Sequence, residues 1–148
     1  MEQVMTSVST QKPSFQSQAA AATAADVMQP PLTTVNQHDH VAAAAYLMKH
    51  AGTTSLMVMD VQTGQPAGII TEADITHAIA DGKDVNDTWV DAVMTTRPAV
   101  TTTTSIRDTA KIMTARHFRH LPVASDTGLL GVVDIIDVCR ALINTTQG

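Results

Sequence analysis

The sequence contains two pairs of residues in which an oxygen-bearing side chain precedes a carboxylate by three positions. Each pair follows a short apolar run. The first pair is Thr71 with Asp74, which follows Gly68-Ile69-Ile70. Thr followed by an acid at this spacing forms a capping box, in which each side chain bonds a free backbone N–H of the first helical turn. The Asp74 carboxylate could instead accept hydrogen bonds from two adjacent hydroxyl groups of a ligand, and such charge-assisted bonds are strong. The motif alone leaves both interpretations open.

The second pair is Asp134 with Asp137, which follows Gly131-Val132-Val133. Asp caps a helix as well as Thr does, so the local structure should not differ from that of the first pair. The extra carboxylate adds negative charge next to Asp137. We therefore expect the second pair to be the poorer place for an anionic ligand.

A basic segment, Arg116-His117-Phe118-Arg119-His120, precedes the apolar run Leu121-Pro122-Val123, whereas the segment Ala51–Ser55 in the matching position carries no charge. Arg offers a fork of donors that suits phosphate oxygens. His120 would strengthen such a contact below about pH 6.5, where an unperturbed imidazole gains a proton. The alternative is a solvated helix end, where basic residues are favoured by the helix dipole.

Other polar residues are weaker candidates. His38 and His40 flank Asp39 and could hold a divalent metal, but no further ligand follows at metal spacing, so we predict that they cap a helix. Cys139 is the one cysteine, which excludes an intramolecular disulfide, and we predict a buried structural thiol. Met57 is a candidate for lining a ligand pocket.

Composition limits the class of protein. The chain has 148 residues, 44% of them hydrophobic, with a net charge of −5 and 3% aromatic residues. The negative charge argues against nucleic-acid binding through a basic surface, and the scarcity of aromatics argues against base stacking. An apolar span of membrane length and a secretory signal are both lacking, so we expect no membrane association and a cytoplasmic location.

The chain repeats itself at a distance of about 65 residues. Each copy has an Asp-containing leading segment, an amphipathic helix, two short apolar strands joined at a Thr-Gly turn, and a second helix. The matched segments are Asp26–Pro30 with Asp91–Pro98, Val41–Met48 with Ile106–Met113, Leu56–Met59 with Leu121–Ala124, Gly68–Ile70 with Gly131–Val133, and Ile75–Ile79 with Val138–Leu142.

One copy has too little apolar surface to form its own core, so two copies should pack sheet against sheet. We predict a mixed α/β (α+β) fold of two tandem repeats of β-α-β-β-α type related by a pseudo-twofold axis. The expected boundaries are a flexible tail at 1–23, the first repeat at 24–80, a polar connector at 81–88, the second repeat at 89–144 and a tail at 145–148.

This order of elements, with a Val-Met-x-x-Pro leading segment and a Gly-h-h-Thr-x-x-Asp junction (h, hydrophobic), resembles the cystathionine-β-synthase-type (CBS) domain family. The segments that carry the resemblance are Asp26–Met28, Gly68–Asp74, His120–Val123 and Gly131–Asp137. The resemblance covers roughly residues 25–143. It implies a stand-alone CBS pair, or Bateman module, with two clefts between the sheets that hold AMP, ADP, ATP or a related adenosine ligand.

The resemblance also implies a crossed site, in which the Thr-x-x-Asp of one repeat holds the ribose and the other repeat contacts adenine and phosphate. On that basis Thr71 and Asp74 share a cleft with Arg119 and His120, while Asp134 and Asp137 face neutral hydroxyls. The resulting candidate nucleotide-binding residues are Thr71, Asp74, Arg119, His120, Pro122, Pro98 and Ile70, and those of a weaker second site are Asp137, Asp134, Thr54 and Ser55.

Three functions compete. The first is a regulatory module that senses an adenine nucleotide, acts without catalysis or a required cofactor, forms a homodimer and regulates a partner protein. The second is a ligand-free dimeric scaffold with vestigial clefts, favoured by the Asp at position 134. The third is an enzyme, against which we weigh the lack of any Ser/His/Asp, Cys/His or metal set at catalytic spacing.

Overall fold

A computed structural model describes residues 22–31 and 33–147 of the chain. The predicted tail at 1–23 therefore lies outside the described residues except for Ala22 and Thr23. The elements in chain order are α2 (Ala24–Val27), β1 (Thr34–Asn36), α3 (Val41–Ala51), β2 (Ser55–Asp60), β3 (Gln65–Thr71), α4 (Glu72–Ala80), the 3₁₀ turn η1 (Val90–Ala92), α5 (Ile106–Arg116), β4 (His120–Ser125), β5 (Gly128–Asp134) and α6 (Ile135–Gln147).

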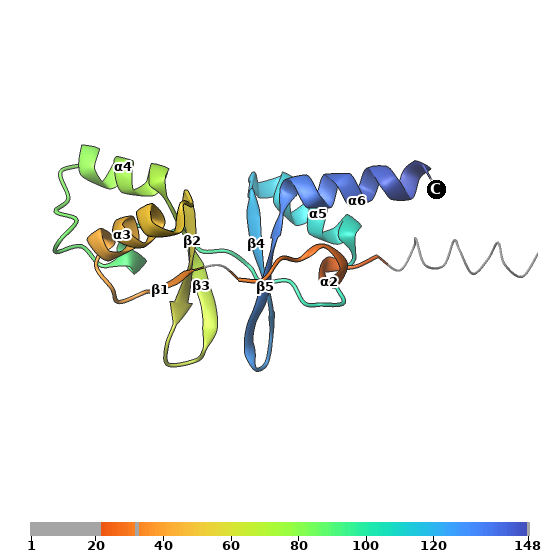
Figure 1. The fold of residues 1–148 in the computed structure, drawn as a ribbon, viewed down its shortest axis with the longest axis horizontal. Helices are drawn as coiled ribbons and strands as arrows, with labels where there is room; N and C mark the ends of the chain where they lie inside the picture. The colour runs from red at the N-terminus through yellow and green to blue at the C-terminus, as the bar shows by residue number, and fades with distance from the viewer. Residues whose placement is uncertain (1–21, 32, 148) are drawn as a thin grey trace, which may run out of the picture.

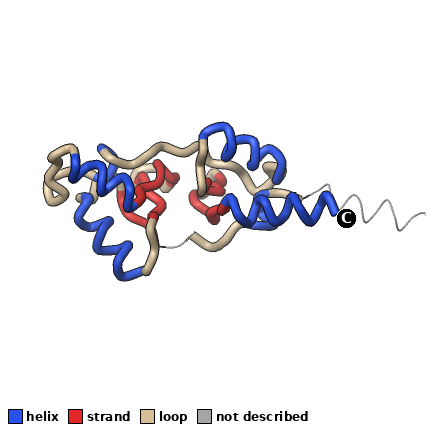
Figure 2. The backbone as a smooth tube through the Cα atoms, turned by 90° about the horizontal axis from the view of Figure 1, so that it is seen from above, coloured by secondary structure: helices blue, strands red, loops and turns tan. Residues whose placement is uncertain are grey.

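The fold is the predicted mixed α/β pair. Each half has an antiparallel hairpin, β2–β3 in the first and β4–β5 in the second, and each hairpin carries a register shift at the matched positions Val58/Met59 and Val123/Ala124. The two sheets face each other in the centre and the helices lie on the outer sides (Figures 1 and 2). Each sheet therefore has one apolar face covered by helices and the opposite face covered by the sheet of the other repeat.

The third strand is where the two halves differ. In the first half β1 pairs in parallel with β2, with Val35 opposite Val58. In the second half the equivalent contact is a single parallel bridge between Val100 and Val123. The duplication therefore extends to the register of this pairing, although the second copy is shorter.

Each half has its own hydrophobic core. The core of the first half is built from Val35, Val41, Ala44, Met48, Leu56, Val58, Ile70, Ile75 and Val90. The core of the second half is built from Ala24, Val100, Ile106, Met113, Phe118, Leu121, Val123, Val133 and Val138. In each list one residue comes from the other sequence repeat, namely Val90 and Ala24.

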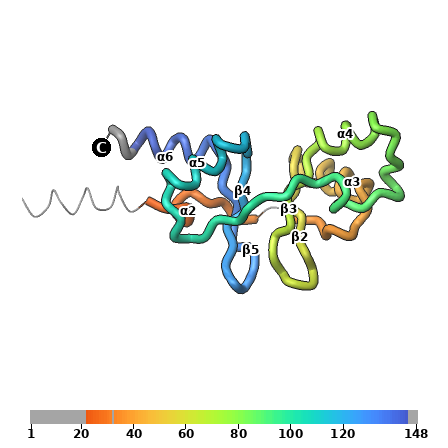
Figure 3. The backbone as a smooth tube through the Cα atoms, turned by 180° about the vertical axis from the view of Figure 1, so that it is seen from behind, coloured from red at the N-terminus to blue at the C-terminus, as the bar shows by residue number. Residues whose placement is uncertain are grey.

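Each core takes a residue from the other sequence repeat because the leading segments are exchanged: each leading segment packs on the half formed mainly by the other repeat. Gln29, at the start of the first repeat, exchanges two backbone hydrogen bonds of 2.9 and 3.0 Å with Val132 of the second. Thr95, at the start of the second repeat, does the same with Ile69 of the first, at 2.9 Å in both directions. Figure 1 shows α2 beside α5 and α6, and Figure 3 shows the connection from η1 toward α5 running between the halves. The structural halves therefore differ from the sequence repeats by these two segments.

Candidate functional site

Two neighbouring cavities lie between the repeats, since residues of both repeats line each of them. The larger cavity has a volume of about 490 Å³ and is lined by Gln29, Pro30, Thr33, Thr53, Thr54, Ser55, Leu56, Met57, Ile69, Arg119, His120, Val132, Asp134, Ile136 and Asp137. The smaller cavity has a volume of about 230 Å³ and is lined by Thr54, Ser55, Ile69, Thr71, Glu72, Ala73, Arg97, Arg119 and His120. The residues common to both are Thr54, Ser55, Ile69, Arg119 and His120, so the cavities share a wall.

Thr71 and Asp74 form a capping box at the start of α4. The Asp74 backbone N–H donates to Thr71 Oγ1 at 3.1 Å, and the Thr71 backbone N–H donates to Asp74 Oδ2 at 2.9 Å. Thr71 lines the smaller cavity, whereas Asp74 lines neither of the two. The structural interpretation of this motif is therefore present in the fold, and one oxygen of the carboxylate is already engaged.

Asp134 contacts the two basic residues, Arg119 and His120, that we expected from the sequence to share a cleft with Thr71 and Asp74. His120 lies opposite Asp134 in the β4–β5 hairpin, and its Nε2 atom is 3.0 Å from Asp134 Oδ2. The Nε atom of Arg119 is 3.9 Å from the same oxygen. The expectation that the acidic pair would face only neutral hydroxyls is wrong, because the Arg119 guanidinium and the His120 imidazole both lie next to Asp134. Asp134 also accepts the Ile136 backbone N–H at 2.8 Å, as a helix cap does.

The His120 side chain is half-buried, and its pKa is lowered from the usual 6.5. Burial is the main cause, because it penalises the charged imidazolium; Asp134 opposes this effect, and the Arg119 charge adds to it. Protonation of His120 therefore begins at a lower pH than the ordinary value assumed from the sequence. At neutral pH the ring is uncharged and can donate one hydrogen bond to Asp134.

Asp137 lies in the first turn of α6 and lines the larger cavity together with Thr54 and Ser55. Its Oδ1 atom is 3.2 Å from the Nη1 atom of Arg140, which is mostly exposed. The set named as the weaker site is thus gathered around the larger cavity. The arrangement provides two carboxylates, a row of hydroxyls and an apolar wall within one crevice.

The family follows from a comparison with known sequences. The profile of the CBS domain matches the chain twice, at residues 24–81 and 90–144. The chain belongs to the CBS domain family. The two matches coincide with the duplicated segments, so this chain contains a CBS pair.

Individual relatives and solved structures agree with this assignment. A curated relative, the mitochondrial CBS domain-containing protein CBSX3 of Arabidopsis thaliana, is 38% identical over 82 residues, which are 53% of this chain and 40% of the relative. This chain therefore spans less than half of the relative. CBSX2 in complex with AMP superposes with a TM-score of 0.65 and 26% identity, over 84% of this chain and 98% of that one. Hypoxic Response Protein I with two coordinated zinc ions superposes with a TM-score of 0.70 and 27% identity, over 80% of this chain and 98% of that one.

Besides Asp74, three of the candidate residues line neither cavity of the CBS pair. Ile70 is fully buried in the core of the first half, and Pro122 is fully buried in strand β4. Pro98 is exposed in the connection before α5. Packing places the side chains of Ile70 and Pro122. A role of all three residues in ligand binding stays a prediction.

Sequence analysis missed Arg97 of the CBS pair. Arg97 directly precedes Pro98 in the second leading segment and lines the smaller cavity. Its Cζ atom lies 4.0 Å from the centre of the Phe118 ring. The signal was available, because Arg97 is the one charged residue between Asp91 and Arg107, but its position depends on the exchange of leading segments.

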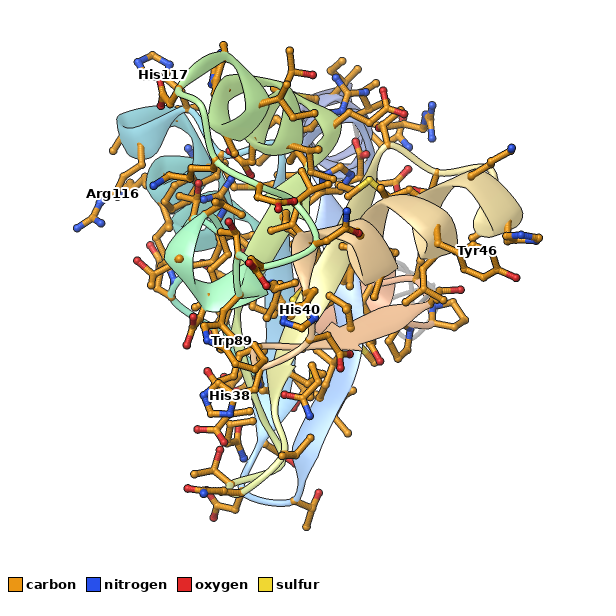
Figure 4. The ribbon with its side chains drawn as sticks, turned by 90° about the vertical axis from the view of Figure 1, so that its left-hand side faces the viewer. His38, His40, Tyr46, Trp89, Arg116 and His117 are labelled. Carbon is orange, nitrogen blue, oxygen red and sulfur yellow. The ribbon has the colours of Figure 1, made fainter. Side chains whose placement is uncertain are left out.

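The histidines before α3 and the cysteine in α6 differ from expectation. His40 is the N-cap residue of α3 without a side-chain capping bond, and its ring stacks on Trp89 at 4.7 Å between centroids. His38 Nε2 lies 3.6 Å from Asp91 Oδ2, and Figure 4 shows both rings gathered around Trp89. His40 therefore occupies the predicted cap position but makes no capping bond with its side chain. The prediction of a buried thiol is wrong, because Cys139 is exposed.

Within residues 22–31 and 33–147, no group of three or more His, Cys, Asp or Glu side chains is arranged to hold a metal ion. Over the same residues, no helix is long and apolar enough to cross a membrane. The cytoplasmic location stays a prediction.

Proposed function

We propose that this CBS pair binds an adenosine nucleotide, AMP, ADP or ATP, in the larger cavity and acts as a regulatory module without catalysis. The observation that carries the proposal is a crevice of about 490 Å³ between the repeats with Asp137, Asp134, Arg119 and His120 on its walls. Cavities that hold small ligands usually measure about 300–1,000 Å³ and combine apolar walls with a few polar groups.

Each part of an adenosine ligand has a matching group in this cavity. The Asp137 carboxylate lines the cavity, and beside its contact with the exposed Arg140 it can accept hydrogens from the ribose hydroxyls, which makes it our proposed ribose ligand in place of Asp74. Met57, Ile69 and Val132 provide an apolar surface for the purine. Arg119 provides donors for a phosphate. The AMP complex of CBSX2, a structure 26% identical to this chain, supports the choice of ligand.

Regulation would come from the position of the cavity. A ligand that contacts Thr54 in the first half and Asp137 in the second can favour one relative placement of the halves over another. It does so only to the extent that its affinity differs between those placements.

The decisive experiment is a thermal-shift series with AMP, ADP, ATP and S-adenosylmethionine, followed by calorimetric titration of the ligand that binds. Asp137→Ala should weaken binding by about ten- to hundredfold, because hydrogen bonds to charged groups are worth about 1.5–3 kcal/mol. Asp74→Ala is the matched control, since it removes a carboxylate from the same sequence position of the other repeat. It should lower stability by about 1 kcal/mol through the lost capping box and leave affinity nearly unchanged. The reverse ranking would assign the site to Asp74.

The alternative function is a ligand-free dimeric scaffold. It is favoured by the contacts of Asp134 with Arg119 and His120, because these polar groups already have partners without a ligand. The absence of a thermal shift with all four compounds, for a protein freed of bound ligand by unfolding and refolding, would support the scaffold.

Both functions include a homodimer. Large apolar side chains stay exposed on the outer helices, namely Tyr46 on α3, Ile79 on α4, and Ile136 and Ile143 on α6. Apolar surface of this kind is typical of protein–protein contacts. Native mass spectrometry should give twice the chain mass of 15.7 kDa, and a monomeric mass at micromolar concentration would contradict the dimer.

A further inference from the structure

The tips of the two hairpins touch each other. The turn between β2 and β3 brings the Gly64 carbonyl oxygen so close to Gly128 that a Cβ atom on Gly128 would lie 2.9 Å from it. The Gln65 side chain spans the same gap, because its Nε2 atom donates to the carbonyl oxygens of Ser125 at 2.9 Å and Asp126 at 3.4 Å. These bonds join positions 60 and 61 residues apart, so the tip contact connects one half of the protein to the other.

The Gln65 amide is not needed to build the turn in which it lies. The turn is closed by the Gly64 backbone N–H, which donates to the Asp60 carbonyl oxygen at 2.8 Å, and the Gln65 backbone N–H donates to Thr63 Oγ1 at 3.2 Å. The matching residue of the second hairpin is Leu129, whose side chain has no donor. The duplication therefore does not account for the bonds of the Gln65 amide, and their effect is to hold the two halves together.

The tip contact and the larger cavity lie at opposite ends of the strands. Strand β2 begins at Ser55, which lines the cavity, and ends at Asp60, which is paired with Gln65. With six residues in β2 and a rise of about 3.3 Å per residue, the two ends lie about 17 Å apart. Figure 1 shows both hairpin tips on the same side of the molecule, away from α4 and α6. Gln65 therefore does not touch a ligand in the cavity.

The two crossings of the leading segments lie between the tip contact and the cavity. The backbones of Ile69 and Thr95 are bonded at one crossing, and those of Val132 and Gln29 at the other. Halves held at the crossings alone would be free to rock about them, and a further contact at the tips restrains this motion. Because residues of both halves line the cavity, its width follows from their relative placement.

We propose that Gln65 is a positioning residue that fixes the relative placement of the two halves and thereby holds the larger cavity in its ligand-binding shape. The link to ligand binding rests on the proposed function, whereas the restraint on the halves does not. Loss of the tip contact lowers the fraction of molecules with the binding-competent placement. The apparent affinity for the ligand then falls by the same factor.

Amide hydrogen exchange of the full chain tests the restraint directly. Gln65→Glu keeps the size of the side chain, but an ionised carboxylate has no donor and is repelled by the carbonyl oxygens that the amide contacts. Exchange of the crossing amides of Ile69 and Thr95 should become about two- to tenfold faster, the factor that corresponds to one hydrogen bond. The amides of Thr53 and Phe118 bond within a single half and should keep their rates. A uniform increase at all four amides would show a general loss of stability and would contradict the restraint.

Two further variants separate the tip contact from the added charge. Gln62→Glu is the matched control, because it adds the same charge at an exposed position of the same turn. It should leave exchange at the crossings unchanged, and an effect equal to that of Gln65→Glu would overturn the proposal. Gln65→Lys restores a donor at the end of a long side chain and should return the crossing amides toward their original rates.

Calorimetric titration with AMP, ADP and ATP separates the restraint from the proposed function. The nucleotide that binds should bind Gln65→Glu about two- to tenfold more weakly than the unmodified chain, with affinity recovered in Gln65→Lys. Faster exchange at the crossings, without binding of any of the three nucleotides to the unmodified protein, supports the restraint and defeats the proposed function. Unchanged exchange in Gln65→Glu, or faster exchange with an unchanged affinity, overturns the positioning role.

Discussion

Gly68 lies directly under the backbone of Thr95, so closely that a Cβ atom on Gly68 would lie 2.5 Å from the Thr95 carbonyl oxygen. The matching Gly131 stands in the same relation to Gln29, whose carbonyl oxygen would be 2.8 Å from the added atom. In each case a leading segment from one repeat crosses a strand of the other. The paired glycines of the Gly-h-h motif are therefore explained by the exchange of leading segments.

Alanine at either crossing glycine should destabilise the fold. Gly68→Ala and Gly131→Ala force a rigid backbone contact apart, and overpacking of this kind costs about 1–3 kcal/mol. Gly82→Ala is the control, because nothing lies within 4 Å of its added Cβ and the cost is limited to about 1 kcal/mol for its positive φ of 86°. Urea unfolding measures all three, and a Gly68→Ala protein as stable as the unmodified chain would contradict the close crossing.

The exchange also predicts that the two halves unfold together. Val90 is fully buried in the core of the first half although it belongs to the second sequence repeat, and Ala24 has the converse position. Strand β3 of the first half also contacts β4 and β5 of the second, so opening of either half exposes apolar strand surface of the other. Urea unfolding followed by Trp89 fluorescence, which reports on the first half, should coincide with unfolding followed by far-ultraviolet circular dichroism. Val90→Ala should shift both curves equally, whereas two separate transitions would show independent halves.

Much of the fold could be predicted because its signal is local and occurs twice. Apolar spacing located α3 and α5, and the Thr-Gly turns located both hairpins, because periodicity and turn chemistry are encoded within a few residues. The exchange of leading segments could not be predicted in this way. Residues 26–30 have the same sequence pattern whichever half they pack on. Long-range contacts therefore determine which of the two halves this segment joins.

The site was less predictable than the fold for a related reason. Sequence placed Arg119 and His120 in a basic segment, but their ion pairs with Asp134 depend on which residues stand opposite in the hairpin. The position of Arg97 over Phe118 depends on where the second leading segment crosses. Cavity size depends on how the two sheets meet, and no local pattern reports it.

His117 ends α5 in a left-handed conformation that its matched residue, Gly52 of α3, adopts more easily. The φ angles are 58° for His117 and 66° for Gly52, and the backbone N–H of each donates to a carbonyl of its helix. Left-handed backbone costs a residue with a Cβ about 1–2 kcal/mol. His117→Gly should therefore raise the free energy of unfolding by about 0.5–1 kcal/mol after the greater flexibility of glycine is included. Gly52→His should lower it, and equal stabilities would contradict the assigned conformation.

The lowered pKa of His120 makes the stability of the protein depend on pH. Burial holds the folded-state pKa below the usual 6.5, so between those two pH values the unfolded chain binds a proton that the folded chain does not. Stability should therefore fall as the pH drops through about 6.5 toward the folded-state pKa, with a contribution from this one group of at most about 1.4 kcal/mol per pH unit. His120→Gln should remove that contribution, as measured by urea unfolding at pH 7.5, 6.5 and 5.5. His77→Gln, at an exposed position on α4, is the control and should retain the full slope. A His120→Gln protein whose stability falls as steeply as that of the unmodified chain would show that Asp134 fully offsets burial at this histidine.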